Sequence, residues 1–197
     1  MIDLESTIRI SPTSETLARI TPLAWKQFGI TRVANITGLD NIGIPVYVSV
    51  RPNSKSLSVS QGKGVSDDLA KISAMMESIE TWHAENIEPN KIILTGSYGL
   101  ASGNNYDEAL CHSLCELIER DAVACWMQLS ESEQDQQLID LHSINDQTTK
   151  LLIEKIIDAD LDVYVWNIEN IFLKCERSRT RLHRFISVPL IVNFLIP

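Results

Sequence analysis

The pattern of apolar and polar positions between residues 58 and 85 predicts a short strand, a turn and a long helix. The strand leads into Gly62-Lys63-Gly64, where the two glycines favour a turn. Either Ser66 or Asp67 is suited to be the N-cap, because its side-chain oxygen can accept a hydrogen bond from an amide of the first helical turn. Apolar residues then recur at spacings of three and four, which indicates one buried face. This predicted buried stripe consists of Leu69, Ile72, Met76, Ile79 and His83.

Upstream of this helix, the pattern predicts one short helix and a small sheet. The helix candidate spans residues 14–19, after Pro12 and before Pro22. β-branched residues between glycines predict a strand over 29–38. Two further strands are expected over 44–50, with Pro45 at the start or edge of an antiparallel hairpin, and over 57–59.

Downstream, a second long helix is predicted over Tyr106–Gln128. It is entered through residues 95–105, which are rich in Gly, Ser and Asn and therefore disfavour a regular helix. A polar stretch over 131–137 predicts a surface loop, and a further helix over 146–159 and a strand over 161–166 follow. The apolar side of the second helix is expected to consist of Leu110, Leu114, Leu117, Ile118 and Ala122.

Composition and charge narrow the class of protein. Hydrophobic residues make up 44% of the 197 positions and charged residues 22%, as in globular proteins. The net charge of −9 argues against binding to nucleic acid or to an anionic membrane. No basic region followed by an apolar run opens the chain, and no stretch reaches the ~20 apolar residues of a membrane span. We therefore expect a cytoplasmic protein.

The last residues differ in composition from the rest. From Lys174 to Pro197 there are five Lys or Arg residues and one acidic residue, followed by an apolar run without a helical or strand period. We expect residues 1–170 to form one domain and 171–197 to be an atypical tail, for instance the product of a frameshift or truncation. Anchoring of residues 185–197 at a membrane interface is the alternative.

The two long helices carry acidic residues whose spacing is compatible with a shared cation. Glu77 and Glu80 project about 60° apart on one helix face, where they repel each other unless they share a cation. Glu108 and the pair Glu116 and Glu119 lie on the second helix. Solvated helix faces explain such residues equally well, and Glu108 also fits a capping box with Asn105.

If these acidic residues converge, the ligands are all oxygen atoms, which favours Mg²⁺ and with it the phosphates of a substrate. The Gly62-Lys63-Gly64 segment can present amides and a lysine to phosphate, but a structural turn explains it as well. The spacing of a Walker loop is absent.

Three stretches of the chain resemble the YcaO-domain family, ATP-dependent enzymes that act on peptide backbone amides. The resemblance covers about residues 8–168, and its two most specific stretches are SAMMESIETWHAE (73–85) and GLASGNNYDEALCHSLCELIERDA (99–122). The third stretch, GITRVANITGLDNIGIPVYVSVRPNSKSLSVSQGKG (29–64), is similar to the branch encoded beside TfuA proteins, which is linked to thioamide formation. The fold implied is α+β, with a mixed or antiparallel sheet packed against the two acid-bearing helices.

The resemblance also implies roles for individual residues. Arg120 matches an arginine that neutralises phosphate charge during catalysis. A second group matches positions that contact the nucleotide: Arg9, Thr16, Ser73, Asn104, Glu108 and again Arg120. The acidic residues that match the Mg²⁺ ligands are Glu77, Glu80, Glu116 and Glu119.

The implied activity is phosphorylation of a peptide amide oxygen by ATP with Mg²⁺, which leads to an azoline or, with sulfide, a thioamide. The implied partners are a precursor peptide or protein, a TfuA-like protein and a second copy of the chain. Family members have about twice this length, and the second half supplies further ATP ligands. The alternative hypothesis is a non-catalytic scaffold that binds a precursor peptide or a partner protein.

Overall fold

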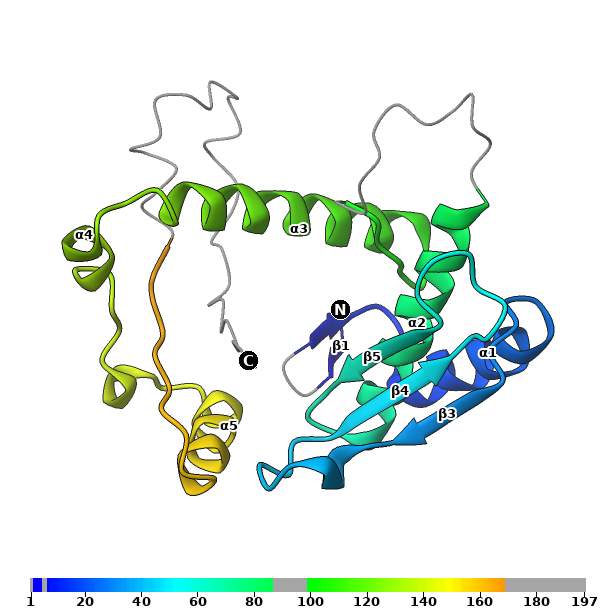
Figure 1. Ribbon diagram of the computed structural model, residues 1–197, viewed down its shortest axis with the longest axis horizontal. Coiled ribbons are helices and arrows are strands. Elements are labelled where there is room, and N and C mark those ends of the chain that lie inside the picture. The colour runs from blue at the N-terminus through cyan, green and yellow to red at the C-terminus, as the bar shows by residue number, and fades with distance from the viewer. Residues whose placement is uncertain (1, 5–6, 87–98, 169–197) are drawn as a thin grey trace. The chain divides into compact units, whose positions relative to one another are not determined.

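A computed structural model describes residues 2–4, 7–86 and 99–168 (Figure 1). The chain divides into two compact units, Met1–Ser113 and Leu114–Pro197. The predicted tail over 171–197 lies outside the described residues, so the domain boundary proposed there remains a prediction.

A three-stranded antiparallel sheet is the centre of the first unit. Strands β3 (Arg32–Asn35), β4 (Val46–Val50) and β5 (Val59–Lys63) follow one another in space as in sequence. The predicted hairpin is confirmed, since Val33 pairs with Ser49 and Pro45 directly precedes β4. The remaining short elements of this unit are β1 (Ile2–Leu4), β2 (Thr7–Arg9) and a 3₁₀ helix (Thr37–Leu39).

Helix α2 (Asp67–Glu85) lies across β4 and β5 (Figure 1). Its N-cap is Ser66, whose Oγ accepts from the Leu69 amide, as predicted. The prediction of its buried stripe is largely wrong, because among those five residues only Ile79 is buried. Small side chains form most of the true buried face, which consists of Ala70, Ala74, Met75, Ser78 and Ile79.

The buried face of α2 differs from the predicted one because of Gly62. This residue lies inside β5 and not in the predicted turn. A Cβ atom on Gly62 would meet the Ala74 nitrogen at 2.0 Å and the Ala70 oxygen at 2.3 Å. The helix backbone therefore rests directly on the strand, which only small residues at the contact allow. This packing accounts for Gly62 without any contact to phosphate.

Helix α1 (Thr13–Lys26) is longer than predicted and continues through Pro22. A proline inside a helix removes one hydrogen bond, so the sequence alone favours an end there. Beyond it, however, Ala24 is completely buried, and this packing outweighs the loss of one bond. The core around Ala24 consists of Phe28, Ile30, Met75 and Ile79.

Helix α3 (Tyr106–Trp126) begins in the first unit and continues into the second. Its predicted apolar side is only partly buried. Ala122 is 2% exposed, whereas Leu110, Leu114 and Leu117 each keep more than two fifths of their surface exposed. The predicted apolar side is therefore exposed at these three leucines.

The second unit contains α4 (Glu131–Asp135), a 3₁₀ helix (Leu141–Ser143) and α5 (Gln147–Asp158). Helix α4 replaces the predicted loop, because the Glu133 carboxylate accepts from the Ser130 amide at 3.0 Å and closes a capping box. The predicted helix α5 is confirmed, with Asp146 as its N-cap.

The predicted strand over 161–166 is reduced to one bridge between Leu138 and Trp166. Residues 99–168 contain no strand beside which this segment could extend its pairing. Val165 is nevertheless buried, with 1% of its surface exposed. With helices beside an antiparallel sheet, the predicted α+β class is confirmed. Across the described residues, no helix combines the length and apolarity required to cross a membrane.

Candidate functional site

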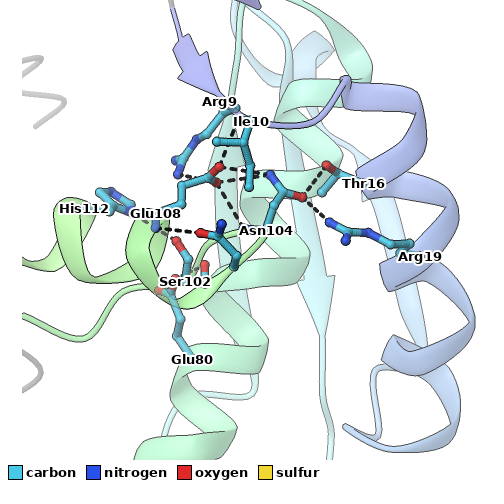
Figure 2. Close-up of polar contacts among 10 residues, drawn as sticks. Arg9, Ile10, Thr16, Arg19, Glu80, Ser102, Asn104, Glu108 and His112 are labelled. Atoms are coloured by element: carbon cyan, nitrogen blue, oxygen red, sulfur yellow. Dashed lines mark hydrogen bonds and ion pairs between the residues drawn. The ribbon is translucent and has the colours of Figure 1, made fainter. Parts of the chain in front are cut away.

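Glu108, in the first turn of α3, binds the N-terminal segment, which lies far from it in sequence, and the loop directly before the helix (Figure 2). Its Oε1 accepts from Arg9 Nη1 at 3.2 Å and from the Asn104 amide at 3.1 Å. Its Oε2 accepts from the Ile10 amide at 3.0 Å. One carboxylate thus joins the end of β2 to the loop before α3.

The environment of Glu108 favours its charged form. Burial of this side chain, which is 8% exposed, would by itself raise the pKa. The hydrogen bonds from the Ile10 and Asn104 amides and the charge of Arg9 outweigh burial, so that the pKa of Glu108 is lowered. The site therefore contains a carboxylate that stays ionised at neutral pH.

Asn104 continues this network to helix α1. Its Oδ1 accepts from Thr16 Oγ1 at 2.8 Å and also from Arg19 Nη2, while its Nδ2 donates to Glu108 Oε1 at 3.1 Å. The amide is thereby oriented with its oxygen toward α1 and its nitrogen toward Glu108. Four residues that the sequence predicts as nucleotide contacts meet here: Arg9, Thr16, Asn104 and Glu108.

Arg19 was not predicted from the sequence. It lies three residues after Thr16 on α1, so the two side chains share one helix face. This spacing could have linked Arg19 to the predicted nucleotide contact Thr16. Nothing in the sequence, however, indicates that this helix face points toward Asn104.

The predicted capping box at α3 is half confirmed. The Asn105 side chain accepts from the Glu108 amide at 2.8 Å, as expected of an N-cap. The Glu108 carboxylate, however, turns to the amide of Asn104 and not to that of Asn105. Glu108 is thus used for contacts between segments.

On α2, Glu80 and Glu77 project toward neighbouring parts of the first unit. Glu80 Oε1 accepts a short hydrogen bond from Ser102 Oγ. Glu77 is exposed and lines an open pocket of about 440 Å³. The other residues that line this pocket are Leu57, Val59, Ser60, Gln61, Lys63, Ser73 and Thr81. The predicted residues Ser73 and Glu77 thus lie together, one turn apart.

The part of α3 within the second unit holds the remaining predicted residues. Arg120 Nε donates to Glu116 Oε1 at 2.7 Å, an i,i+4 pair on the helix surface. Glu119 is exposed. The two glutamate pairs therefore belong to different units. In the described portion of the chain, no three His, Cys, Asp or Glu side chains form a group that could hold a metal.

These residues fit ATP and Mg²⁺ in their chemistry. The donors on α2 and α3 are carboxylate oxygens, and Mg²⁺ in proteins is often held by one or two carboxylates together with substrate phosphates. Glu77 and Glu80, one turn apart, meet that requirement without a third protein ligand. Arg9, Arg19 and Lys63 supply positive charge in the same unit.

The chain also matches known proteins. The sequence profile of the YcaO family, described as an ATP- and Mg²⁺-binding cyclodehydratase, matches residues 87–172. The chain is 32% identical, over 213 residues, to an uncharacterized protein encoded in the region 3′ of tfuA in Rhizobium leguminosarum bv. trifolii. The alignment covers 75% of this chain and 50% of that protein. The structure also matches a solved YcaO fold, with a TM-score of 0.61.

This chain belongs to the YcaO family.

The solved YcaO structure is that of Methanopyrus kandleri, bound with AMPPCP and Mg²⁺. It is 18% identical, and the match covers 78% of this chain and 54% of that one, which supports the fold. An uncharacterized protein of Mycobacterium tuberculosis H37Rv is 34% identical over 185 residues, covering 60% of this chain and 42% of its own length. The chain spans about half the length of the curated relatives that it matches.

Proposed function

We propose that this YcaO chain binds ATP with Mg²⁺ and takes part in the ATP-dependent activation of peptide backbone amides. The observation that carries the proposal is the network around Glu108. Arg9, Thr16, Asn104 and Glu108 come from three separate parts of the sequence, yet hydrogen bonds join them into one cluster. They are the residues for which the family resemblance implies contact with the nucleotide.

In this proposal the carboxylates of Glu77, Glu80, Glu116 and Glu119 hold Mg²⁺. Glu77 and Glu80 lie one helical turn apart, where two carboxylates repel each other, and a divalent cation removes that cost. Arg120, whose guanidinium already pairs with a glutamate at 2.7 Å, would neutralise phosphate charge. Ser73, next to Glu77 along the pocket, is the remaining nucleotide contact.

ATP would supply the phosphoryl group that turns the amide oxygen into a leaving group. The residues of this chain contribute position and charge, the main protein contributions to phosphoryl transfer. Glu108 and Asn104 hold the nucleotide end of the site, and the glutamates and Arg120 hold the phosphates. ADP would leave after the transfer. Attack of a neighbouring thiol or hydroxyl on the amide carbon, with cleavage of the C–O bond and departure of phosphate, would then yield an azoline, and the same attack by external sulfide would yield a thioamide.

The proposed partners follow from the same family assignment. They are a precursor peptide or protein as substrate, a TfuA-like protein, and a second copy of this chain as a homodimer. One relative is encoded in the region 3′ of tfuA, which supports the second of these. The open pocket beside Glu77 is a suitable place for a peptide segment, because polar groups and two apolar side chains, Leu57 and Val59, line it together.

Calorimetric titration of ATP and Mg²⁺ into the full chain tests this proposal. The wild type is expected to release heat of binding that disappears in the double variant Glu77→Ala/Glu119→Ala. The matched control, Glu131→Ala/Glu154→Ala, removes the same charge from exposed helix positions and is expected to bind like the wild type. Unchanged binding by the first double variant contradicts the metal site. A wild type that binds a precursor peptide but no nucleotide supports the scaffold alternative.

A further inference from the structure

We propose that Ser102 is a positioning residue that orients the Glu80 carboxylate toward Mg²⁺, an inference that rests on the proposed function. Ser102 Oγ donates a short hydrogen bond to Glu80 Oε1, from the loop before α3 to the middle of α2 (Figure 2). Neither the family resemblance nor the helix pattern assigns a role to this serine. The donor is a neutral hydroxyl, so this contact adds no positive charge beside the Glu80 carboxylate.

The position of Ser102 is itself fixed by α3. Its backbone oxygen lies 3.4 Å from His112 Nδ1. At the next residue, a Cβ atom on Gly103 would meet the Ala109 nitrogen at 2.4 Å, so this part of the loop rests directly on the helix. The hydroxyl thus reaches Glu80 from a backbone that α3 supports.

A fixed carboxylate matters for this metal in particular. Mg²⁺ requires near-ideal octahedral geometry, with oxygen ligands at about 2.0–2.1 Å. A glutamate side chain has several rotatable bonds, and a half-buried one on a helix samples more than one rotamer unless a neighbour restrains it. Groups that hydrogen-bond to a metal ligand typically contribute about 10–100-fold to metal affinity.

Glu77 provides the contrast on the same helix face. In the portion of the chain that the structure describes, no hydrogen bond reaches the Glu77 carboxylate, and the side chain is exposed. Of the two predicted ligands on α2, Glu80 therefore accepts a hydrogen bond that restrains its carboxylate. The exposed side chain of Glu77 can change its torsion angles more easily. A bound ion would take its geometry mainly from Glu80.

The competing explanation is that the bond from Ser102 to Glu80 only ties the loop to α2. The bond from Ser113 to Gly99 ties the same loop but does not touch a predicted metal ligand. Ser113→Ala is therefore the matched control for Ser102→Ala, since each removes one hydroxyl and one hydrogen bond from this loop. Ser102→Thr keeps the hydroxyl and is the conservative variant.

The experiment measures ATP affinity of the full chain by calorimetry over a series of Mg²⁺ concentrations, together with the melting temperature. We expect Ser102→Ala to raise the Mg²⁺ concentration for half-maximal ATP binding about 10–100-fold. Ser113→Ala and Ser102→Thr are expected to remain within about threefold of the wild type, while both alanine variants lower the melting temperature similarly.

Two results would contradict the role of Ser102 without contradicting the proposed function. In the first, Ser102→Ala binds ATP with the Mg²⁺ requirement of the wild type. In the second, Ser113→Ala shifts that requirement as much as Ser102→Ala, which indicates a loop tie without metal specificity. If the wild type fails to bind ATP at every Mg²⁺ concentration, both the proposed function and this inference are wrong, so the two failures are distinguishable.

Discussion

Arg51 Nη1 donates to Glu85 Oε2 at 2.8 Å, and the side chains of the pair are only 4% and 7% exposed. The bond joins the residue after β4 to the last turn of α2, with a second contact from the Ser56 amide to Glu85 Oε1 at 2.8 Å. The hydrogen bond from Arg51, aided by those from Ser56 and opposed by burial, lowers the pKa of Glu85 to about 2. The pair therefore fixes the far end of the helix that carries Glu77 and Glu80.

Glu85→Gln is expected to destabilise the chain by about 3 kcal/mol, because it leaves the buried Arg51 charge uncompensated. Urea unfolding, followed by tryptophan fluorescence, measures this loss. Glu154→Gln, at an exposed position of α5, is the control and should change stability by less than about 0.5 kcal/mol. Equal stability of the two variants would contradict the structural role of the pair.

The same pair gives a pH dependence of defined sign. A carboxyl group whose pKa is lowered in the folded state contributes stability above its unfolded pKa of 4.5, and that contribution is lost as the pH falls toward about 2. We expect the urea midpoint of the wild type to fall more steeply between these values than that of Glu85→Gln. Parallel pH profiles would exclude Glu85 as the source.

Gly62→Ala is expected to cost about 3 kcal/mol or more, because the added methyl group would overlap the backbone of α2. Gly38→Ala is the matched control, since a Cβ atom there meets nothing within 4 Å. The melting temperatures of the two variants, measured by circular dichroism, provide the comparison. A Gly62→Ala protein as stable as the control would show that α2 can lift from β5 at little cost.

Glu108→Gln tests the connection between the N-terminal segment and α3. The variant keeps one acceptor oxygen but places an NH₂ group against one of the donors from Ile10, Asn104 or Arg9. We expect the Ile10 amide to exchange its hydrogen about tenfold faster, as measured by NMR, since loss of one such bond costs about 1 kcal/mol or more. Glu15→Gln, an exposed change on α1, is expected to leave this rate unchanged.

Arg19→Ala tests the residue that the sequence did not reveal. Under the proposed function, loss of the bond to Asn104 Oδ1 should weaken ATP affinity about fivefold, because one hydrogen bond contributes about 1 kcal/mol. Arg32→Ala removes the same charge from an exposed position of β3 and controls for long-range electrostatics. Equal affinities of the two variants would mean that Arg19 does not act through Asn104.

Local signals in the sequence predicted much of this fold. Ser66 and Asp146 mark helix starts because their side-chain oxygens satisfy free amides, and this interaction needs no knowledge of the rest of the chain. The strands around Val33 and Val48 follow from β-branched residues between turn residues. These elements depend on near neighbours in sequence, which is why a single sequence is sufficient.

What the sequence could not predict depends on distant contacts. Ala24 holds α1 together beyond Pro22 through packing against residues that lie about 50 positions away, such as Met75. The small residues Ala70 and Ala74, not the large apolar ones, face the sheet because Gly62 lies opposite them. In the candidate site, the partners of Arg19 and Ser102 lie more than 20 positions distant, so no local pattern reveals them.

The absence of a side chain at Gly62 has a consequence for how α2 responds to a ligand. A helix separated from a sheet by side chains can slide or roll as those chains change rotamer, but α2 lies on β5 backbone to backbone. The backbone of the helix that carries Glu77 and Glu80 is thus held in a fixed position on the sheet. Any induced fit around an incoming ion has to come from their own side-chain torsions and from loops, not from displacement of the helix.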